Sequence, residues 1–190
     1  MVPPFDRVSR CYDVCMHCGR FYHDEQILDA LMLSGNERIV DIGGGTGHYA
    51  IAFAKHCRQV TVLDESPDML AKVPPHEKIR VVRGDALQTG LDAASFDLAL
   101  LSDVIHHIPA QDQLLDEVYR LLKPGGRLVI HDFAANSRRV RLFGHLERLF
   151  IGPVTYHTLD AMAAICAQHH LAPLSSIDMH WYYLIIATKS

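Results

Sequence analysis

Five short runs of branched aliphatic residues, alternating with longer segments of helical character, constrain the fold of this chain more than any other feature. Each run is almost continuously apolar, which is typical of a strand whose two faces are both covered by helices. The five runs are ERIVDI, QVTVLD, IRVVRG, FDLALLS and GRLVIHDF. Because these strands and helices alternate without an intervening linker, the sequence predicts one doubly wound α/β unit with a parallel sheet.

The end of the chain predicts a different kind of strand pairing. The segments LSSIDMH and WYYLIIATK follow one another with almost no connection, and such a short link permits only an antiparallel pair. We therefore expect a mostly parallel, Rossmann-like sheet of seven strands that ends in an antiparallel hairpin. Between the fourth and fifth strands, leucine and valine recur at helical spacing over residues 114–122, and Lys123-Pro124-Gly125-Gly126 is expected to end that helix.

Size and charge narrow the class of protein. The chain has 190 residues, the size of one ordinary domain, so we expect a single domain over residues 1–190, with helices in residues 1–35 as a substrate lid. The formal net charge of -4 gives no overall attraction to nucleic acid. No apolar run approaches the roughly 20 residues that span a bilayer. We expect a cytoplasmic monomer or homodimer that acts on a small molecule, without nucleic acid or a membrane.

The most specific local pattern is the glycine-rich turn from Gly43 to Gly47, between the first strand and the next helix. In an open α/β sheet the ligand crevice lies at this edge, beyond the carboxyl ends of the strands. A phosphate-binding GxxxxGK[ST] loop is excluded because His48, not lysine, follows the turn, and His48 also replaces the third glycine of the dinucleotide pattern GxGxxG. Asp41 precedes the turn, and its carboxylate suits a ligand with an ammonium group better than a pyrophosphate.

Two further carboxylates follow neighbouring strands. Asp64 ends the second strand, 21 positions after Gly43, where a carboxylate can accept hydrogen bonds from both hydroxyls of a ribose. Asp85 follows the third strand and can accept a hydrogen bond from the exocyclic amine of adenine. Together with Asp41, these residues predict a nucleoside that carries a charged, amino-acid-like tail.

Five motifs in order resemble the class I S-adenosylmethionine-dependent methyltransferases, in particular the type 11 group that includes the quinone-biosynthesis C-methyltransferases. The motifs are DIGGGTG (41–47), LDESPDML (63–70), RGDA (83–86), FDLALLSDVIHHI (96–108) and LLKPGGRLVI (121–130). The resemblance extends from about residue 5 to the C-terminus. It implies the methyltransferase variant of the doubly wound fold, with S-adenosylmethionine as the cofactor.

The resemblance also implies which residues contact the cofactor. Gly43, Gly45 and Gly47 would lie against the methionine part, Asp64 would hold the ribose, Met69 and Asp85 would meet the adenine, Ser102 would border the sulfonium, and Asp41, Gly44, Glu65 and Ala86 would be further contacts. Tyr12, in the opening segment FDRVSRCYD, corresponds to a tyrosine that often reaches the cofactor in this group.

The chemistry makes a general base optional. Methyl transfer from a sulfonium is an in-line displacement, so alignment and desolvation of the two reactants supply much of the rate. Where the acceptor carries a proton, His107 of the pair His106-His107 is the candidate base, because related sequences often have histidine at that position. Alternatively, the histidine pair only caps and packs the following segment. Asp103 and His131 are weaker candidates, and residues 134–158 are expected to form substrate walls.

The N-terminal cysteines allow more than one interpretation. Cys11, Cys15 and Cys18 have the CxxxCxxC spacing of the cluster ligands in radical S-adenosylmethionine enzymes, but here they precede the first strand and a complete glycine-rich turn follows. On a helix they would share one face and pack as small hydrophobic residues. Alternatively, they bind zinc with His17 or His23 as a fourth ligand, or receive a soft substrate such as an arsenic or mercury species.

The sequence thus supports two hypotheses of different classes. The first is an enzyme that transfers a methyl group from S-adenosylmethionine to a small molecule. The second is a non-catalytic module that responds to the cofactor or to a metal through its cysteine cluster. The intact cofactor motifs favour the first hypothesis.

Overall fold

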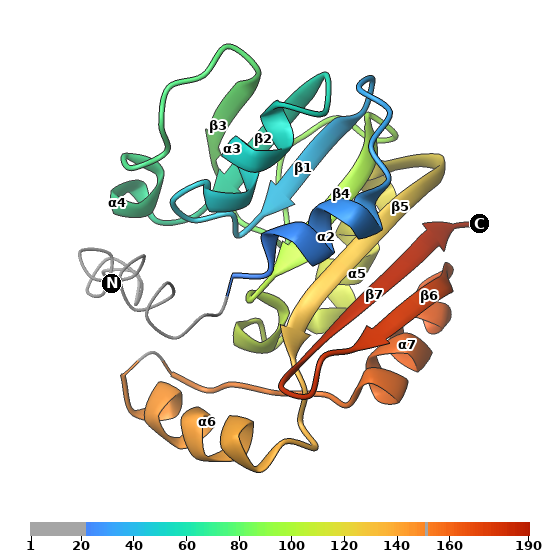
Figure 1. Ribbon diagram of the computed structural model, residues 1–190. Coiled ribbons are helices and arrows are strands. Elements are labelled where there is room, and N and C mark those ends of the chain that lie inside the picture. Colours follow the sequence, from blue (N-terminus) through green and yellow to red (C-terminus); the bar gives the residue numbers. More distant parts are fainter. Residues whose placement is uncertain (1–21, 151) are drawn as a thin grey trace.

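The structure, a computed structural model, describes residues 22–150 and 152–190. Its middle layer is a seven-stranded sheet of order β3-β2-β1-β4-β5-β7-β6 (Figure 1). The strands are β1 (Arg38–Ile42), β2 (Gln59–Asp64), β3 (Ile79–Arg83), β4 (Phe96–Ser102), β5 (Leu122–Phe133), β6 (Leu171–Asp178) and β7 (Tyr182–Lys189). The first five strands pair in parallel, and β7 runs antiparallel to both β5 and β6. The predicted seven-stranded α/β fold with its terminal hairpin is confirmed.

Helices cover both faces of the sheet (Figure 1). On one face, α2 (Asp24–Leu31) and α3 (His48–Ala54) pack with the strands in one apolar cluster. On the other face, α5 (Gln111–Leu121) and α7 (Leu159–Gln168) pack with the strands in a second cluster. The remaining helical elements are α4 (Pro67–Leu70), the 3-10 helix η1 (Ile105–His107) and α6 (Arg138–Phe150), which lies beyond the end of β5.

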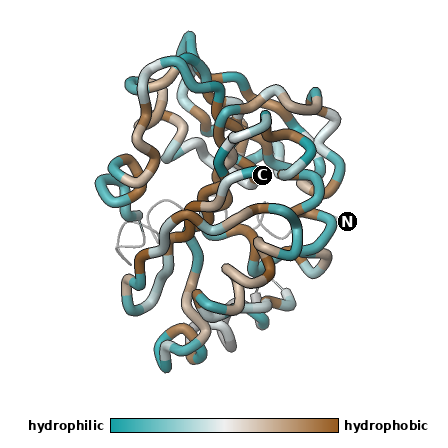
Figure 2. The backbone as a smooth tube through the Cα atoms, turned by 90° about the vertical axis from the view of Figure 1, so that its right-hand side faces the viewer, coloured by the Kyte–Doolittle hydropathy of each residue, from teal (hydrophilic) through white to brown (hydrophobic). Residues whose placement is uncertain are grey.

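The burial of the strands follows from this layering. The middle strands β1, β2 and β4 are buried along almost their whole length, because helices exclude water from both of their faces. The tube in Figure 2 accordingly shows its most apolar segments in the middle of the molecule. The edge strands β3 and β6 are largely exposed.

The crossover helix ends within one residue of the predicted position, but the predicted start of the fifth strand is wrong. The helix α5 ends at Leu121, and β5 begins at Leu122, so that the segment Lys123–Gly126 belongs to the strand. Leu122 already pairs with Phe96 of β4, and the register shifts before regular pairing begins with Leu98 and Arg127. Gly125 and Gly126, whose residue type usually ends a helix, therefore lie inside the first part of the strand.

The described part of the N-terminal region contains only α2. Ile27 and Leu31 of this helix are fully buried against the face of the sheet, next to α3. The remaining prediction of helices over residues 1–35, and of their use as a lid, depends on residues 1–21, which lie outside the described residues.

Candidate active site

A cavity of about 410 Å³ lies at the carboxyl ends of β1, β2 and β4, where the sequence predicts the ligand crevice. Its lining comes from the ends of these strands and from the loops that follow them. The predicted residues that line it are Asp41, Gly43, Gly44, Gly45, Asp64, Glu65, Met69, Asp85, Ala86, Ser102 and His107. Residues that are up to 66 positions apart in the sequence thus surround one space.

Backbone hydrogen bonds tie the glycine-rich turn to β2. The N–H groups of Gly43 and Gly44 both donate to the carbonyl oxygen of Leu63, at 2.7 and 3.2 Å. Gly43 has a φ of 71°, and a β-carbon at this position would collide with the side chain of Val104. Glycine is required there because only glycine combines the positive φ with such a close approach.

Asp64 holds the turn from the side. Its carboxylate accepts hydrogen bonds from the backbone N–H of Gly45 at 3.0 Å and from that of Ser66 at 2.9 Å, one on each oxygen. Each carboxylate oxygen offers more than one lone pair. The Asp64 side chain can therefore keep the turn in place and still accept hydroxyl groups from a ligand.

Asp41 is the most unusual polar group of the cavity. The residue is only 2% exposed, and its Oδ2 atom is buried without a hydrogen-bond partner among the described residues. Burial, with a further contribution from the negative charge of Asp64, raises the pKa of Asp41 to about 7. A buried carboxylate with an unused acceptor atom is costly unless a cation or a donor reaches it. The ammonium group of an amino-acid-like ligand would supply both a hydrogen-bond donor and a positive charge.

Met69 and Asp85 line the part of the cavity that follows β2 and β3. Met69 lies in α4, where its backbone N–H donates to the capping side chain of Ser66 at 3.1 Å, and the residue is only 3% exposed. Asp85 accepts a hydrogen bond from the backbone N–H of Leu87 at 2.8 Å. The pair combines an apolar surface with a hydrogen-bond acceptor, as the predicted adenine site requires.

Ser102 and His107 form the wall that follows β4. The Ser102 hydroxyl lies 3.0 Å from Nδ1 of His131, which is fully buried. Burial, together with the charge of His106, lowers the pKa of His107 to about 2. The His107 ring is therefore neutral at physiological pH.

Some predicted residues are not part of this lining. Gly47 caps the start of α3 with a φ of 76°, and a β-carbon there would approach Cγ1 of Val73 to 2.9 Å, so this glycine serves the turn and its packing. Tyr12 and the cysteine cluster Cys11, Cys15 and Cys18 lie outside the described residues. Their predicted roles stay predictions.

The structure adds aromatic residues that the sequence analysis did not assign. Tyr22, His48 and Tyr49 line the cavity. The Tyr22 ring stacks on the His48 ring with centroids 3.4 Å apart, and His48 Nε2 lies 2.7 Å from a carboxylate oxygen of Asp24. His48 and Tyr49 directly follow the glycine-rich turn, which is a usable signal, whereas no sequence pattern marks Tyr22.

Comparison with known proteins shows that the chain contains a methyltransferase domain. The methyltransferase domain family matches residues 40–130. Over 119 residues the chain is 37% identical to the ubiquinone/menaquinone biosynthesis C-methyltransferase UbiE of Rubrivivax gelatinosus, a match that covers 62% of this chain and 47% of that protein. These matches support the predicted resemblance to the class I S-adenosylmethionine-dependent methyltransferases.

Two further comparisons define the extent of the likeness. The 27-O-demethylrifamycin SV methyltransferase of Amycolatopsis mediterranei is 27% identical over 176 residues, which cover 83% of this chain and 62% of that protein. A Haloferax volcanii methyltransferase, solved with the Trm112 methyltransferase activator, has the same fold, with a TM-score of 0.85, 16% identity and coverage of 100% of this chain and 99% of that chain. The chain spans about half the length of the first curated relatives it matches.

The described residues lack two kinds of feature. No helix in residues 22–150 and 152–190 combines the length and the apolar character needed to cross a bilayer. Within the same part of the chain, no three histidine, cysteine or acidic side chains are grouped so that they could hold a metal ion.

Proposed function

We propose that this chain transfers the methyl group of S-adenosylmethionine to a small-molecule acceptor in the cavity at the carboxyl ends of β1, β2 and β4. The observation that carries the proposal is Asp41, whose buried Oδ2 atom lacks a hydrogen-bond partner beside the glycine-rich turn. The cofactor brings an ammonium group, which supplies both a donor and a compensating charge. Neither a phosphate nor a pyrophosphate would relieve the same carboxylate.

The other strand ends fit the remaining parts of the cofactor. Asp64 would accept the ribose hydroxyls while it holds Gly45, and Met69 and Asp85 would take the adenine ring and its amine. Ser102 would border the sulfonium. The proposed contacts are completed by Gly43, Gly44, Glu65 and Ala86. The bound cofactor supplies an electrophilic methyl group, and the chain supplies orientation and exclusion of water.

His107 would accept a hydrogen bond from the substrate that receives the methyl group. Because burial holds the pKa of His107 far below its usual value, the ring is not protonated at pH 7. A neutral His107 can still align an acceptor N–H or O–H group and polarise it as the methyl group arrives. We therefore propose alignment by His107, with proton transfer to it only as the new bond forms.

The rest of this wall is apolar. Val104, Ile108, Pro109 and Pro153 line the cavity next to His107, so an acceptor with an apolar face would bury that face here. The names of the two relatives describe methyl transfer to a quinone precursor and to a rifamycin, both ring compounds. We propose an acceptor of this general kind, a small molecule with an apolar ring system.

Two linked measurements test the proposed function. Titration calorimetry with S-adenosylmethionine should show binding with one site per chain, and incubation with methyl-labelled cofactor and a cell metabolite extract should place the label in a small molecule. Asp160→Asn, which changes an exposed carboxylate on α7, is the matched control for substitutions in the cavity. A wild-type protein that binds no S-adenosylmethionine would contradict the proposal.

A further inference from the structure

A buried histidine–carboxylate pair lies directly behind the cavity wall. Asp132, at the end of β5, and His106, in η1, are 1% and 2% exposed. The Nδ1 atom of His106 lies 2.5 Å from Oδ1 of Asp132, and the His106 backbone N–H donates to Oδ2 at 3.3 Å. The backbone N–H of Phe133 also donates to the Asp132 carboxylate, at 2.6 Å. The carboxylate thus fixes both the main chain and the side chain of His106.

The same histidine holds a segment from a distant part of the chain. The backbone N–H of Thr155 donates to the carbonyl oxygen of His106 at 2.8 Å. Two residues on, His157 Nε2 lies 2.7 Å from the side-chain oxygen of Gln111, whose amide donates to the carbonyl of Ile105 in η1 at 3.0 Å. Residues 152–157 are therefore attached to η1 at two points.

Both parts that the pair connects belong to the cavity. His107, the neighbour of His106, lines the cavity from η1, and Gly152 and Pro153 line it from the attached segment. The rings of His106 and His107 have centroids 3.9 Å apart, and the ring of Tyr156 lies 5.0 Å from that of His106. A shift of His106 would therefore move the His107 wall and the Pro153 wall together.

We propose that the His106–Asp132 pair is a positioning pair for methyl transfer, which holds η1 and residues 152–157 so that His107 and Pro153 enclose the acceptor. The inference rests on the function proposed above. It assigns to the pair a role in the rate of transfer rather than in cofactor binding, because neither residue belongs to the lining of the cavity. A misplacement of about 1 Å in such a wall is enough to slow a reaction about 100-fold.

A more exposed histidine–aspartate pair elsewhere in the protein provides a control for the chemical change. His169 Nδ1 lies 2.7 Å from Oδ1 of Asp116, between the end of α7 and α5, and the Asp116 side chain is 72% exposed. Asp116→Asn therefore makes the same chemical change as Asp132→Asn in a pair that touches neither η1 nor residues 152–157.

Two substitutions at His106 separate positioning from simple loss of packing. His106→Asn keeps a side-chain N–H close to the position of Nδ1 and can still donate to Asp132. His106→Ala removes both the donor and the ring. Each variant is compared with the wild type for three quantities: the Kd for S-adenosylmethionine, the initial rate of label transfer into a metabolite extract, and the hydrogen-exchange rate of the Thr155 amide.

We expect Asp132→Asn and His106→Ala to lower the transfer rate by about 10- to 100-fold while the Kd for S-adenosylmethionine changes by less than about threefold. The Thr155 amide should exchange faster in both, and His106→Asn should retain most of the wild-type rate. Asp116→Asn should match the wild type in all three quantities.

The outcomes separate this inference from the proposed function. Wild-type transfer rates in Asp132→Asn would overturn the positioning role, and so would an equal loss of cofactor binding. Failure of His106→Asn to recover more than His106→Ala would also overturn it. A wild-type protein that binds no S-adenosylmethionine would instead contradict the proposed function, on which the pair's role depends.

Discussion

Replacing Asp41 by asparagine should stabilise the empty protein while it weakens cofactor binding. In the absence of ligand, the Asp41 carboxylate is buried beside Asp64, and its Oδ2 atom has no hydrogen-bond partner among the described residues. Asparagine has nearly the same shape but no charge, so Asp41→Asn removes the cost of burying that charge. The same change removes the negative charge of the carboxylate that, in our proposal, binds the ammonium group of the cofactor.

The size of the effect follows from the pKa of Asp41. Burial raises this pKa from 3.8 to about 7, which corresponds to about 4 kcal/mol of unfavourable interaction in the charged form. Well below pH 3.8, Asp41 is protonated in both the folded and the unfolded protein, so the charge has no effect. As the pH rises towards 7, the unfolded chain loses the proton first, and the free energy of unfolding of the wild type falls relative to that of the variant. The difference levels off above pH 7.

Urea unfolding of the two proteins without cofactor, from pH 5 to pH 8, measures this difference directly. We expect the stability advantage of Asp41→Asn to grow by about 2–3 kcal/mol across that range, while Asp160→Asn shows no such growth. Calorimetry should show a loss of about 1.5–3 kcal/mol in the binding of S-adenosylmethionine by Asp41→Asn, the usual value of a hydrogen bond to a charged group. An advantage that does not depend on pH, or a variant less stable than the wild type at pH 8, would refute the reasoning.

Three other substitutions test separate parts of the structure. Gly45→Val forces a branched side chain into a φ of 52° and brings its β-carbon to 3.2 Å from Cε of Met69 at the cavity wall, so it should abolish cofactor binding in a protein that still shows wild-type circular dichroism; an unchanged Kd by calorimetry would contradict this placement. Asp64→Ala should weaken cofactor binding by about 1–3 kcal/mol, because the ribose hydroxyls and the Gly45 N–H lose their acceptor; a Kd equal to that of the wild type would remove Asp64 from the site. At His169, burial lowers the pKa, but the hydrogen bonds that the ring donates to Asp116 and Asp112 outweigh it, so the pKa is raised overall; these contacts stabilise the fold below about pH 6.5, and the contribution is lost as the pH rises through the raised pKa. His169→Gln should therefore lower the melting temperature more at pH 6 than at pH 8, with a loss in the free energy of unfolding below about 1 kcal/mol because the carboxylates are exposed; a larger loss at pH 8 would show that the contacts do not act this way.

Much of the fold could be predicted from the sequence because the middle parallel strands have to be apolar on both faces. The run VTVL in β2 and the run LALL in β4 make both faces of each strand apolar, so helices must cover the sheet on both sides to exclude water. The start of β5 was less predictable. Lys123-Pro124-Gly125-Gly126 has the composition of a helix stop, but the pairing of Leu122 with Phe96 extends the strand across it. The start of β5 thus depends on pairing between residues distant in the chain, which the local amino-acid composition does not reveal.

The cofactor side of the cavity could be predicted more fully than the acceptor side. Asp41, Asp64 and Asp85 stand at fixed points relative to strands and to the glycine-rich turn, so the topology of the sheet brings them together. His106 and His107, by contrast, are neighbours with the same side chain. Only the 3-10 turn of η1 directs one into the protein towards Asp132 and leaves the other at the cavity.

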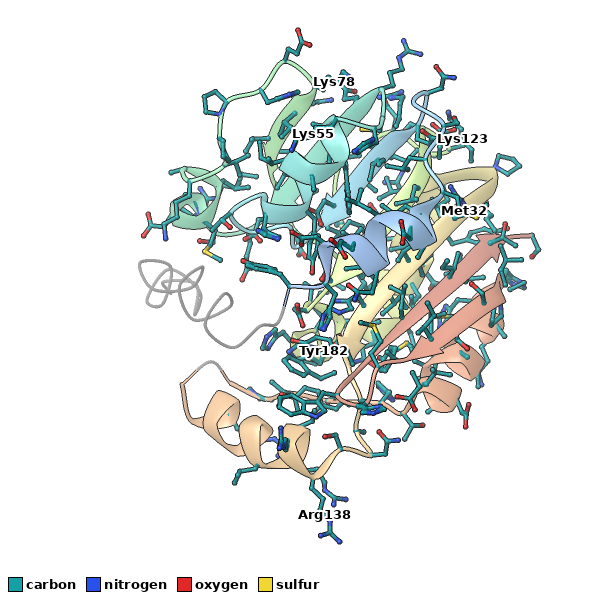
Figure 3. All side chains as sticks on the ribbon, viewed as in Figure 1. Met32, Lys55, Lys78, Lys123, Arg138 and Tyr182 are labelled. Carbon is teal, nitrogen blue, oxygen red and sulfur yellow. The ribbon has the colours of Figure 1, made fainter. Side chains whose placement is uncertain are left out.

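A small apolar cluster of Phe133, Val140 and Tyr182 could not be predicted from the sequence, because it forms between residues that are distant in the chain. Phe133 and Tyr182 pack against Val140 of α6, and Figure 3 shows Tyr182 at this lower end of the sheet. These residues come from the end of β5 and from the starts of α6 and β7. Nothing in their local sequence marks them as partners.

The attachment of residues 152–157 through η1 has a consequence for how such a protein can diversify. The segment lies between β5 and α7 in the chain and contributes no strand to the sheet, so insertions or replacements there would leave the interior of the domain and the turn after β1 intact. A lineage could exchange this one stretch and acquire a different repertoire of substrates, provided that each new version preserves an anchor to the carbonyl of His106.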